Sequence, residues 1–379
     1  MMRAIRWLWL VLPRGWVLFV FFLVYAFLEA NWLYSPDREL LAVRNTVVGI
    51  GCFAYGLFRA IAFHPLNSDE YRKWLAVSPW TVGKRLPAGP VHLVVQDLLV
   101  MGVLLSLLHP WDMKVLAYLS VFLFPYQLVL CLTLWPTGQR WTCYALLLAL
   151  GLPIRLLEHP TVATGVLVLL YPFTYWASRR CLGAFPWDVP EWWDGSRRKA
   201  AERGHDPSRI YPLLGWPFDW LPRFRIPLAI SIADGTALSV LAGWWLYTLM
   251  AHVPRQGQAA VLTAVVTVVL FGGCIQRTAM YCGTYRSPIS IWGRIWTLRW
   301  IIPRYDVVFV TPLLTFLVVV IAEAMLIRYE VDLTIGTPIV VAIGTWIALN
   351  LGPTFEPWQL TGGHRIVPKY ANKRDVVQL

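Results

Sequence analysis

The sequence predicts an all-α polytopic membrane protein with about ten transmembrane helices, arranged as two unequal parallel repeats. Three observations support this fold class. Hydrophobic residues make up 58% of the 379 residues and charged residues only 14%, with a mean hydropathy of +0.55, whereas soluble proteins carry about 25% charged residues. About ten apolar runs are long enough to cross a bilayer. A Ser-Pro segment followed by Gly and basic residues occurs twice, each time between two apolar runs.

The apolar runs begin close to the N-terminus. Residues 5–12, rich in Trp and Leu, predict an amphipathic helix on the membrane surface. The first run continues past Tyr34 without a small-x-small cleavage site, so it is predicted to be a retained span and not a signal peptide. Runs of about 17 to 25 residues place the ten spans at 16–34, 44–63, 91–109, 114–135, 141–158, 160–178, 227–251, 259–282, 306–327 and 336–353.

Basic residues predict the orientation, because loops rich in Lys and Arg stay on the cytoplasmic side. With the N-terminus inside, 27 of the 33 Lys and Arg residues lie on or near that side. We therefore expect an integral protein of the bacterial inner (cytoplasmic) membrane with both termini in the cytoplasm. The net charge of +12 belongs to the membrane faces, so lipids are expected as partners and nucleic acid is not.

The longest polar stretch, residues 179–226, divides the chain. We expect an interfacial helix and six spans over 1–178, this Trp- and Pro-rich connector at the cytoplasmic interface, four spans over 227–353, and a cytoplasmic tail over 354–379. The connector is too short for an independent domain. Its carboxylates and His205 alternate with basic residues, and no spacing singles out an acid and a base. No catalytic residue is predicted.

Nothing in the sequence indicates a bound metal or nucleotide. The six cysteines are scattered, mostly within apolar runs, without CxxC or other metal-ligand spacing. The chain also contains no GxxxxGK[ST] segment, which would cradle phosphates with backbone amides and a lysine. We therefore expect free thiols, no metal, no cofactor and no ATP hydrolysis in this chain.

The two Ser-Pro segments match beyond the dipeptide. Both continue into basic residues, and their members are Ser78, Pro79, Lys84 and Arg85 in the first and Ser287, Pro288 and Arg294 in the second. At the same offset of 209 residues, Asp97 is matched by Asp306. A Ser before a Pro is typical of an N-cap and first helical position, so we expect each segment to begin a short helix. Six spans separate them, which predicts a parallel repeat; chance recurrence of a common helix start is the alternative.

The first segment resembles the coupling region of ABC-2 type exporter membrane subunits. In that family an interfacial helix and two spans precede a short cytoplasmic coupling helix, which often reads Leu-Pro-Val-Ser-Arg before a Gly-Lys pair. Residues 71–84, Tyr-Arg-Lys-Trp-Leu-Ala-Val-Ser-Pro-Trp-Thr-Val-Gly-Lys, are similar in order and spacing. The similarity covers residues 3–178 and returns in reduced form over 227–353. The family usually has six spans, so ten would imply a fused, lopsided pseudo-dimer.

The resemblance implies the permease subunit of an exporter that moves an apolar or amphipathic substrate and is driven by a separate ATPase. That ATPase would bind the helices beginning at Ser78 and Ser287, and its acidic groups would pair with Lys84, Arg85 and Arg294. Contact with anionic inner-leaflet lipids is the alternative role of these bases. A multi-span scaffold or assembly subunit without transport, and a membrane-embedded lipid-modifying enzyme, remain open as other function classes. Each is compatible with a homo- or hetero-oligomer.

Seven ionisable residues are predicted within spans or at their ends, where a charge is costly unless it is paired or hydrated. They are Glu29, Arg59, Asp97, Asp234, Arg277, Asp306 and Glu323. The two glutamates lie toward the outer side. Four of the others lie about 6–10 Å deep at the inner side: Arg59, Asp97, Asp234 and Arg277. Similar depth predicts that Arg59 pairs with Asp97, and Arg277 with Asp234 or Asp306. Such pairs either fix helix register or belong to a gate or substrate path; snorkelling of both arginines is a third alternative.

Overall fold

The computed structural model describes residues 11–13, 15–34, 38–108, 115–187, 231–252, 291–300, 307–329 and 331–350. These residues form α-helices and one short 3-10 helix, with no strand among them, so the all-α prediction is confirmed for this part of the chain. The chain divides into two compact units between residues 194 and 195. That boundary lies inside the predicted connector, and each unit is described separately.

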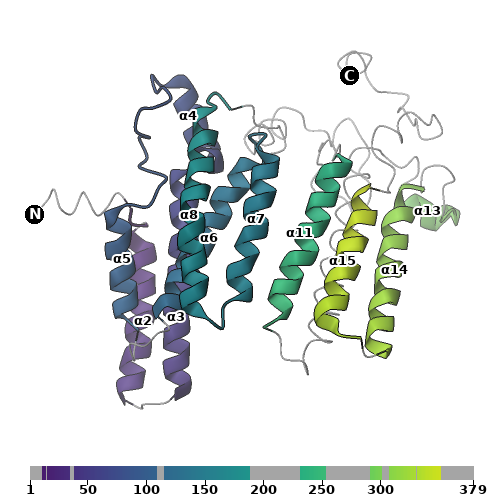
Figure 1. Ribbon diagram of the computed structural model, residues 1–379, viewed down its shortest axis with the longest axis horizontal. Helices are drawn as coiled ribbons and strands as arrows, with labels where there is room; N and C mark the ends of the chain where they lie inside the picture. The colour runs from purple at the N-terminus through teal and green to yellow at the C-terminus, as the bar shows by residue number, and fades with distance from the viewer. Residues whose placement is uncertain are drawn as a thin grey trace, which may run out of the picture. The chain divides into compact units, whose positions relative to one another are not determined.

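The first unit is a bundle built around one central helix. Its elements are α2 (Gly15–Tyr34), α3 (Arg38–Phe63), η1 (Pro65–Asn67), α4 (Asp69–Val77), α5 (Val95–Ser106), α6 (Val115–Leu134), α7 (Arg140–Arg155) and α8 (Pro160–Gly183). Helix α6 contacts α3, α5, α7 and α8, while α2 packs on α3 (Figure 1). Helices α2, α3, α6 and α8 are long and apolar enough to cross a membrane. The protein is therefore an integral membrane protein.

Two predicted spans of this unit correspond to shorter helices. The span at 91–109 contains α5, whose 12 residues extend only about 18 Å and cannot alone cross a hydrocarbon core of about 30 Å. Residues 78–94, which lead into α5, are not helical. Helix α7, in the span at 141–158, has 16 residues and extends about 24 Å. The expectation of a full-length helix over 91–109 is therefore wrong.

One buried cluster gathers the helix ends that the basic residues predict to be cytoplasmic. Leu66 follows α3, Leu134 ends α6, Cys143 lies in the first turn of α7, and Ala177 and Cys181 lie near the end of α8. These helices therefore alternate in direction as the order of predicted spans requires. Both cysteines are free and buried, and their small side chains let the helix ends pack closely.

The second unit contains α11 (Ile232–Met250), α13 (Ile291–Thr297), α14 (Val307–Arg328) and α15 (Leu333–Asn350). Helix α15 packs against both α11 and α14 (Figure 1). A Cβ added at Gly243 would lie 2.8 Å from the Pro338 carbonyl oxygen and 2.9 Å from Ala342 Cβ, so this glycine allows close approach of α11 and α15, as small residues do in membranes. Trp346 Nε1 donates to the Thr236 hydroxyl at 3.1 Å. The predicted span at 259–282 lies outside the described residues.

The expectation that Ser78 begins a short helix is wrong. Helix α4 ends at Val77, and Ser78 is its C-terminal cap, with its N–H donating to the carbonyls of Trp74 and Leu75. The helix begins instead after Ser68, whose hydroxyl accepts the N–H of Tyr71 at 3.3 Å. Ser68 is followed by two acidic residues, a strong helix start. Ser78 is followed by Pro-Trp-Thr-Val-Gly, and β-branched residues and Gly disfavour a helix.

The second Ser-Pro segment, Ser287 and Pro288, lies outside the described residues. In that region the described helix α13 begins at Ile291, after the Ser-Pro dipeptide, whereas α4 ends before Pro79. The short helices therefore occupy different positions relative to their Ser-Pro dipeptides, because Ser68 rather than Ser78 begins the first. This offset removes one of the correspondences on which the predicted repeat depends.

Candidate functional site: the Arg59–Asp97 network

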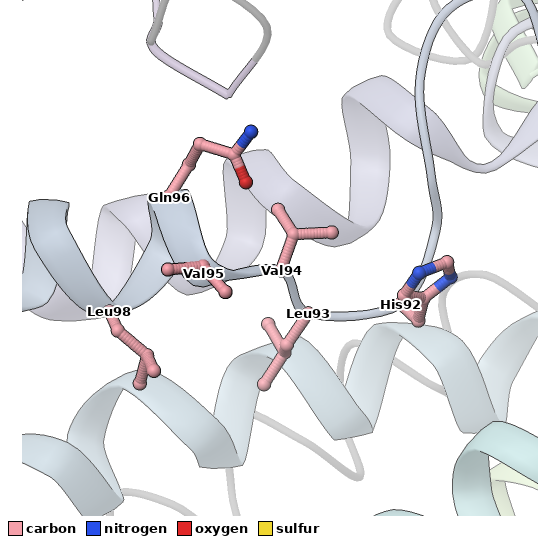
Figure 2. A pocket seen from close by; sticks show the side chains of 6 residues that line it. All are labelled: His92, Leu93, Val94, Val95, Gln96 and Leu98. Atoms are coloured by element: carbon pink, nitrogen blue, oxygen red, sulfur yellow. The ribbon is translucent and has the colours of Figure 1, made fainter. Parts of the chain in front are cut away.

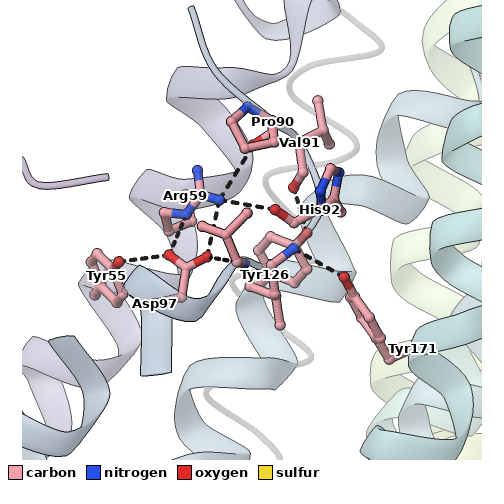
Figure 3. A network of polar contacts seen from close by, with 10 residues as sticks. Tyr55, Arg59, Pro90, Val91, His92, Asp97, Tyr126 and Tyr171 are labelled. Atoms are coloured by element: carbon pink, nitrogen blue, oxygen red, sulfur yellow. Dashed lines mark hydrogen bonds and ion pairs between the residues drawn. The ribbon is translucent and has the colours of Figure 1, made fainter. Parts of the chain in front are cut away.

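Arg59 on α3 and Asp97 on α5 form a buried ion pair, as their similar predicted depth indicated. Arg59 Nε donates to Asp97 Oδ1 at 2.6 Å, and Nη2 donates to Oδ2 at 3.1 Å (Figure 3). The side chains are 0% and 2% exposed. The ring of Phe63 lies 4.2 Å from the guanidinium carbon, within the range of a cation–π contact. Both charges are thus compensated inside the unit.

Asp97 is held by two further donors. Tyr55, four residues before Arg59 on α3, donates its hydroxyl to Asp97 Oδ1 at 2.7 Å. The N–H of Val94 donates to Asp97 Oδ2 at 2.8 Å. Because Asp97 is the third residue of α5, it satisfies the N–H just before the helix and places a negative charge where the helix dipole favours one. The carboxylate therefore both pairs with Arg59 and caps α5.

The chain segment from Pro90 to Val94 is fixed by side chains of four helices. Besides the Val94 N–H bond to Asp97, Arg59 Nη2 donates to the carbonyl oxygens of Pro90 at 3.3 Å and of His92 at 3.1 Å (Figure 3). The Tyr126 hydroxyl on α6 donates to the Val91 carbonyl oxygen at 2.6 Å. The Leu93 N–H donates to the Tyr171 hydroxyl on α8 at 3.0 Å. Every residue of this segment has one backbone bond to α3, α5, α6 or α8. Non-helical backbone is tolerated at membrane depth when protein groups satisfy it in this way.

The part of the same connector closer to α4 is exposed. Val77 is 85% exposed, and Lys84 and Arg85 are exposed as well. The turn is closed by Lys84 Nζ, which donates to the Pro79 carbonyl at 3.2 Å, and by Trp80 Nε1, which donates to the Lys84 carbonyl at 3.3 Å. The connector thus presents a compact basic turn at one end and a segment bonded into the bundle at the other.

An open depression adjoins the anchored segment (Figure 2). It has a volume of about 580 Å³ and is lined by His92, Leu93, Val94, Val95, Gln96 and Leu98. Four of these side chains are aliphatic, and none is a carboxylate. Since a hydrolytic lipid-modifying site needs an acid and a base converging on one atom, this lining favours contact with an apolar group over chemistry.

His64 is a buried polar residue that sequence reasoning missed. It caps η1, with the Leu66 N–H donating to its Nδ1 at 3.4 Å, and its Nε2 lies 3.5 Å from the Thr133 hydroxyl of α6. Full burial lowers the pKa of His64 to about 3. A signal was present, because His64 precedes Pro65 at the first position of η1, where a capping residue is needed.

Glu29, which the sequence predicts to lie toward the outer side, also has an arginine partner. Arg44 Nη1 on α3 donates to Glu29 Oε2 on α2, and Arg44 is 1% exposed. The Trp32 ring lies 5.0 Å from its guanidinium carbon and the Tyr25 ring 6.0 Å. Sequence reasoning placed Arg44 at the outer face, but not in a pair, since it lies at the start of a predicted span.

Two further charged positions of the second unit are described. Asp234 lies in the first turn of α11 and takes part in its N-cap: its N–H donates to Ser231 Oγ at 3.1 Å, and that hydroxyl donates to Asp234 Oδ2 at 2.8 Å. Glu323 on α14 accepts a hydrogen bond from the Thr337 hydroxyl on α15 at 3.2 Å.

Of the predicted partner-contacting residues in this unit, the described one is Arg294 in α13, which donates to the Trp300 carbonyl at 3.2 Å. Arg277 and Asp306 lie outside the described residues, and so does the pairing predicted for Arg277.

The tyrosines of the network were not identified from the sequence. Tyr55 had a signal, because a residue four positions before Arg59 lies on the same helix face. Tyr126 and Tyr171 had none, since periodicity does not tell which apolar runs become neighbours. Their hydroxyls contact backbone of the segment before α5, which is remote from both in the sequence.

The network is suited to holding helices and a connector in place. Both charges of the Arg59–Asp97 pair are engaged by hydrogen bonds, which connect α3 to α5 and to the segment before it. Among the described residues, no group of three His, Cys, Asp or Glu side chains could hold a metal ion. Comparisons with protein-family models, with curated proteins and with solved structures find no match to this chain.

Proposed function

We propose that this chain is the membrane-spanning subunit of an ABC-2-like exporter, which a separate ATPase drives and which moves an apolar or amphipathic substrate. One observation carries the proposal: between α3 and α5, Val77, Pro79 and residues 81–85 are exposed, whereas Pro90 to Val94 are hydrogen bonded to four helices. A partner that displaced α4 would pull on α3, α5, α6 and α8 together. A coupling element needs this property, since a movement imposed from outside must reach the spans.

The proposed contact surface is α4 with the turn that follows it, and not a helix beginning at Ser78. Lys84 and Arg85 supply positive charge, and Val77 supplies an exposed apolar contact. Acidic groups on the ATPase would pair with the two bases, and complementary charge speeds and orients such encounters. The second contact would involve α13, which carries Arg294.

The proposal includes the bacterial inner membrane as location, with both termini in the cytoplasm. Its support is the excess of basic residues on one side and the buried cluster that gathers the corresponding ends of α3, α6, α7 and α8. Helix α4 follows α3 at that end, so the proposal assigns α4 to the cytoplasmic side, where an ATPase would be found.

The ten-span arrangement in two parallel halves is part of the same proposal. In it the third crossing combines the anchored segment with α5: five residues add at most about 17 Å to the roughly 18 Å of the helix. Hydrogen bonds between side chains and the backbone of each of residues 90–94 support this crossing, because they replace part of the missing helical hydrogen bonding. The match of Asp97 with Asp306 supports the duplication.

Charge reversal tests the ATPase contact. The full chain and its Lys84→Glu, Arg85→Glu double variant are purified from native membranes, and co-purifying chains that carry a GxxxxGK[ST] motif are identified by mass spectrometry together with ATPase activity. We expect such a chain with the wild type and its loss with the double variant. Arg155→Glu, a single reversal at the far end of α7, should retain the chain. Retention by the double variant, or absence of any such chain from the wild type, would refute the proposal.

A multi-span scaffold without transport activity is the second candidate. The burial of the Arg59–Asp97 pair favours it, because an almost fully buried pair that links α3 to α5 serves to hold the two helices in register. The two candidates differ in their response to nucleotide. In the exporter, ATP added to the complex should change the rate of trypsin cleavage after Lys84 or Arg85, whereas in a scaffold that rate should not respond.

A further inference from the structure

Glu323 on α14 is a buried carboxyl group in an apolar layer of the second unit. It is 5% exposed, and the Thr337 hydroxyl donates to its Oε2 at 3.2 Å. Its Oε1 is buried and has no hydrogen-bond partner in the described part of the chain. One helical turn away on each helix, Val319 and Val341 belong to a buried cluster. On this side the carboxyl group therefore adjoins a buried apolar layer.

The opposite side of the carboxyl group is apolar as well. A Cβ added at Gly336 on α15 would lie 3.0 Å from the side chain of Leu326 on α14. Glu323 and Thr337 thus lie between two layers in which the helices are in close contact, Val319 with Val341 and Leu326 with Gly336. Separation of α14 and α15 would open this position to water.

The acidic residues of the first unit have a different environment. Glu29 pairs with Arg44, and Asp97 pairs with Arg59. Around Glu323 the described residues offer no such cation. An ionised carboxylate with one neutral donor would bear most of its desolvation cost uncompensated, whereas a protonated carboxyl group would not.

The charged groups on the neighbouring helices do not change this conclusion. Helix α15 carries no titratable side chain, and α14 carries only Arg328 besides Glu323. Arg328 follows five residues later, about 140° round the helix. Helix α11, which packs on α15, carries Asp234 and Tyr247; Asp234 is capped by Ser231. In the turn before α15, Asp332 accepts the N–H of Thr334 at 3.0 Å.

We propose that Glu323 and Thr337 form a proton-binding site between α14 and α15. The carboxyl group keeps its proton while the two helices are packed together. When they separate and water enters, the carboxyl O–H bond breaks, the proton passes to water and a carboxylate remains; no other bond changes. Occupancy of the site thus depends on the packing of α14 against α15. The inference is independent of the ATPase contact.

Infrared spectroscopy of the full chain in lipid nanodiscs tests the site directly. A protonated carboxyl group gives a C=O stretching band that is separate from carboxylate bands. At neutral pH we expect the wild type to show this band and Glu323→Gln to lose it. Glu29→Gln is the matched control, because it removes another acidic residue of an apolar helix that has an arginine partner, and it should leave the band unchanged. A band that survives Glu323→Gln, or its absence from the wild type, would overturn the proposal.

A second measurement requires no substitution. Dicyclohexylcarbodiimide reacts with protonated carboxyl groups: the O–H adds across one C=N bond, and the O-acylisourea rearranges to a stable N-acylurea where water is excluded. Peptide mass spectrometry of the treated wild type should show modification several-fold greater at Glu323 than at Glu29 and Asp97. Equal modification of the three would overturn the proposal. So would loss of the infrared band on adding Na⁺ at constant pH, which would identify a cation site instead.

Discussion

Arg59 and Asp97, 38 residues apart in the chain, share two hydrogen bonds in the interior of the first unit. Each residue also has a task that the other could not perform. Asp97 accepts the Val94 N–H at the start of α5, and Arg59 donates to the carbonyls of Pro90 and His92. The two residues of the pair therefore cannot be exchanged without loss of these backbone hydrogen bonds.

Substitution of Asp97 tests this relationship. We expect Asp97→Asn to lower the free energy of unfolding by about 3–5 kcal/mol, because it leaves the Arg59 charge buried without its partner. The combined reversal Arg59→Asp, Asp97→Arg should recover little, since an arginine at the start of α5 opposes the helix dipole and an aspartate on α3 cannot donate to the two carbonyls. Unfolding in mild detergent measures both. Full recovery by the double reversal would show that only the Coulomb term matters.

The tyrosine contacts should control access to the connector. Tyr126→Phe removes the donor to the Val91 carbonyl, and a buried carbonyl left unsatisfied costs about 1–3 kcal/mol. We expect faster trypsin cleavage after Lys84 and Arg85 in the variant, because the segment that follows them is held less tightly. Tyr144→Phe is the control, since the Tyr144 hydroxyl accepts from Nε1 of Trp135, the residue after α6, which lies outside the connector. Equal cleavage rates in all three proteins would contradict the anchoring role.

The Arg59–Asp97 pair was predictable because charged residues in apolar runs are few and costly. Depth alone then limited Arg59 to very few partners. The same logic did not reveal Tyr126, whose hydroxyl is compatible with a core or an interfacial position and is assigned only by three-dimensional packing. The sequence therefore predicts the partners of buried charges better than the partners of buried hydroxyls.

The error at Ser78 has a different physical cause. A Ser next to a Pro marks a helix boundary, but Ser78 also lies just after a stretch that Ser68 and its acidic neighbours already start as a helix. Ser78 could therefore end a preceding helix or begin a following one. The stronger helix start at Ser68 decides that the helix lies before Ser78. The shortness of α5 had a sequence signal in Gly89 and Pro90, which disfavour regular helix. An apolar run shows that residues avoid water, not that they are helical.

Close contact between α11 and α15 predicts that Gly243 cannot be enlarged. In Gly243→Ala the new Cβ would lie 2.8 Å from the Pro338 carbonyl oxygen, so the helices must separate, and overpacking of this kind costs about 1–3 kcal/mol. Gly102→Ala in α5 is the matched control, because nothing lies within 4 Å of the added Cβ. That substitution should be neutral or stabilise the protein by up to about 1 kcal/mol. Thermal unfolding of both variants measures the difference, and similar effects at the two positions would contradict the close contact.

Burial of His64 predicts a loss of stability in acid. Its pKa is about 3 in the folded protein and about 6.5 in an unfolded chain, so between these values the unfolded chain binds a proton that the folded protein does not. The free energy of unfolding should therefore fall as the pH drops below about 6.5, by roughly 1.4 kcal/mol per pH unit once the unfolded histidine is charged. Above that pH the residue adds no dependence.

The control for this effect is His64→Asn, which keeps a capping acceptor before Pro65 but does not titrate. Between about pH 7 and about pH 5, the wild type should lose about 2 kcal/mol more stability than the variant. The acidic residues of the protein titrate in both, so the difference between the two proteins isolates the histidine. Chemical unfolding in the same detergent at the two pH values measures it. Parallel losses would mean that the imidazole binds its proton in the folded protein as readily as in the unfolded chain.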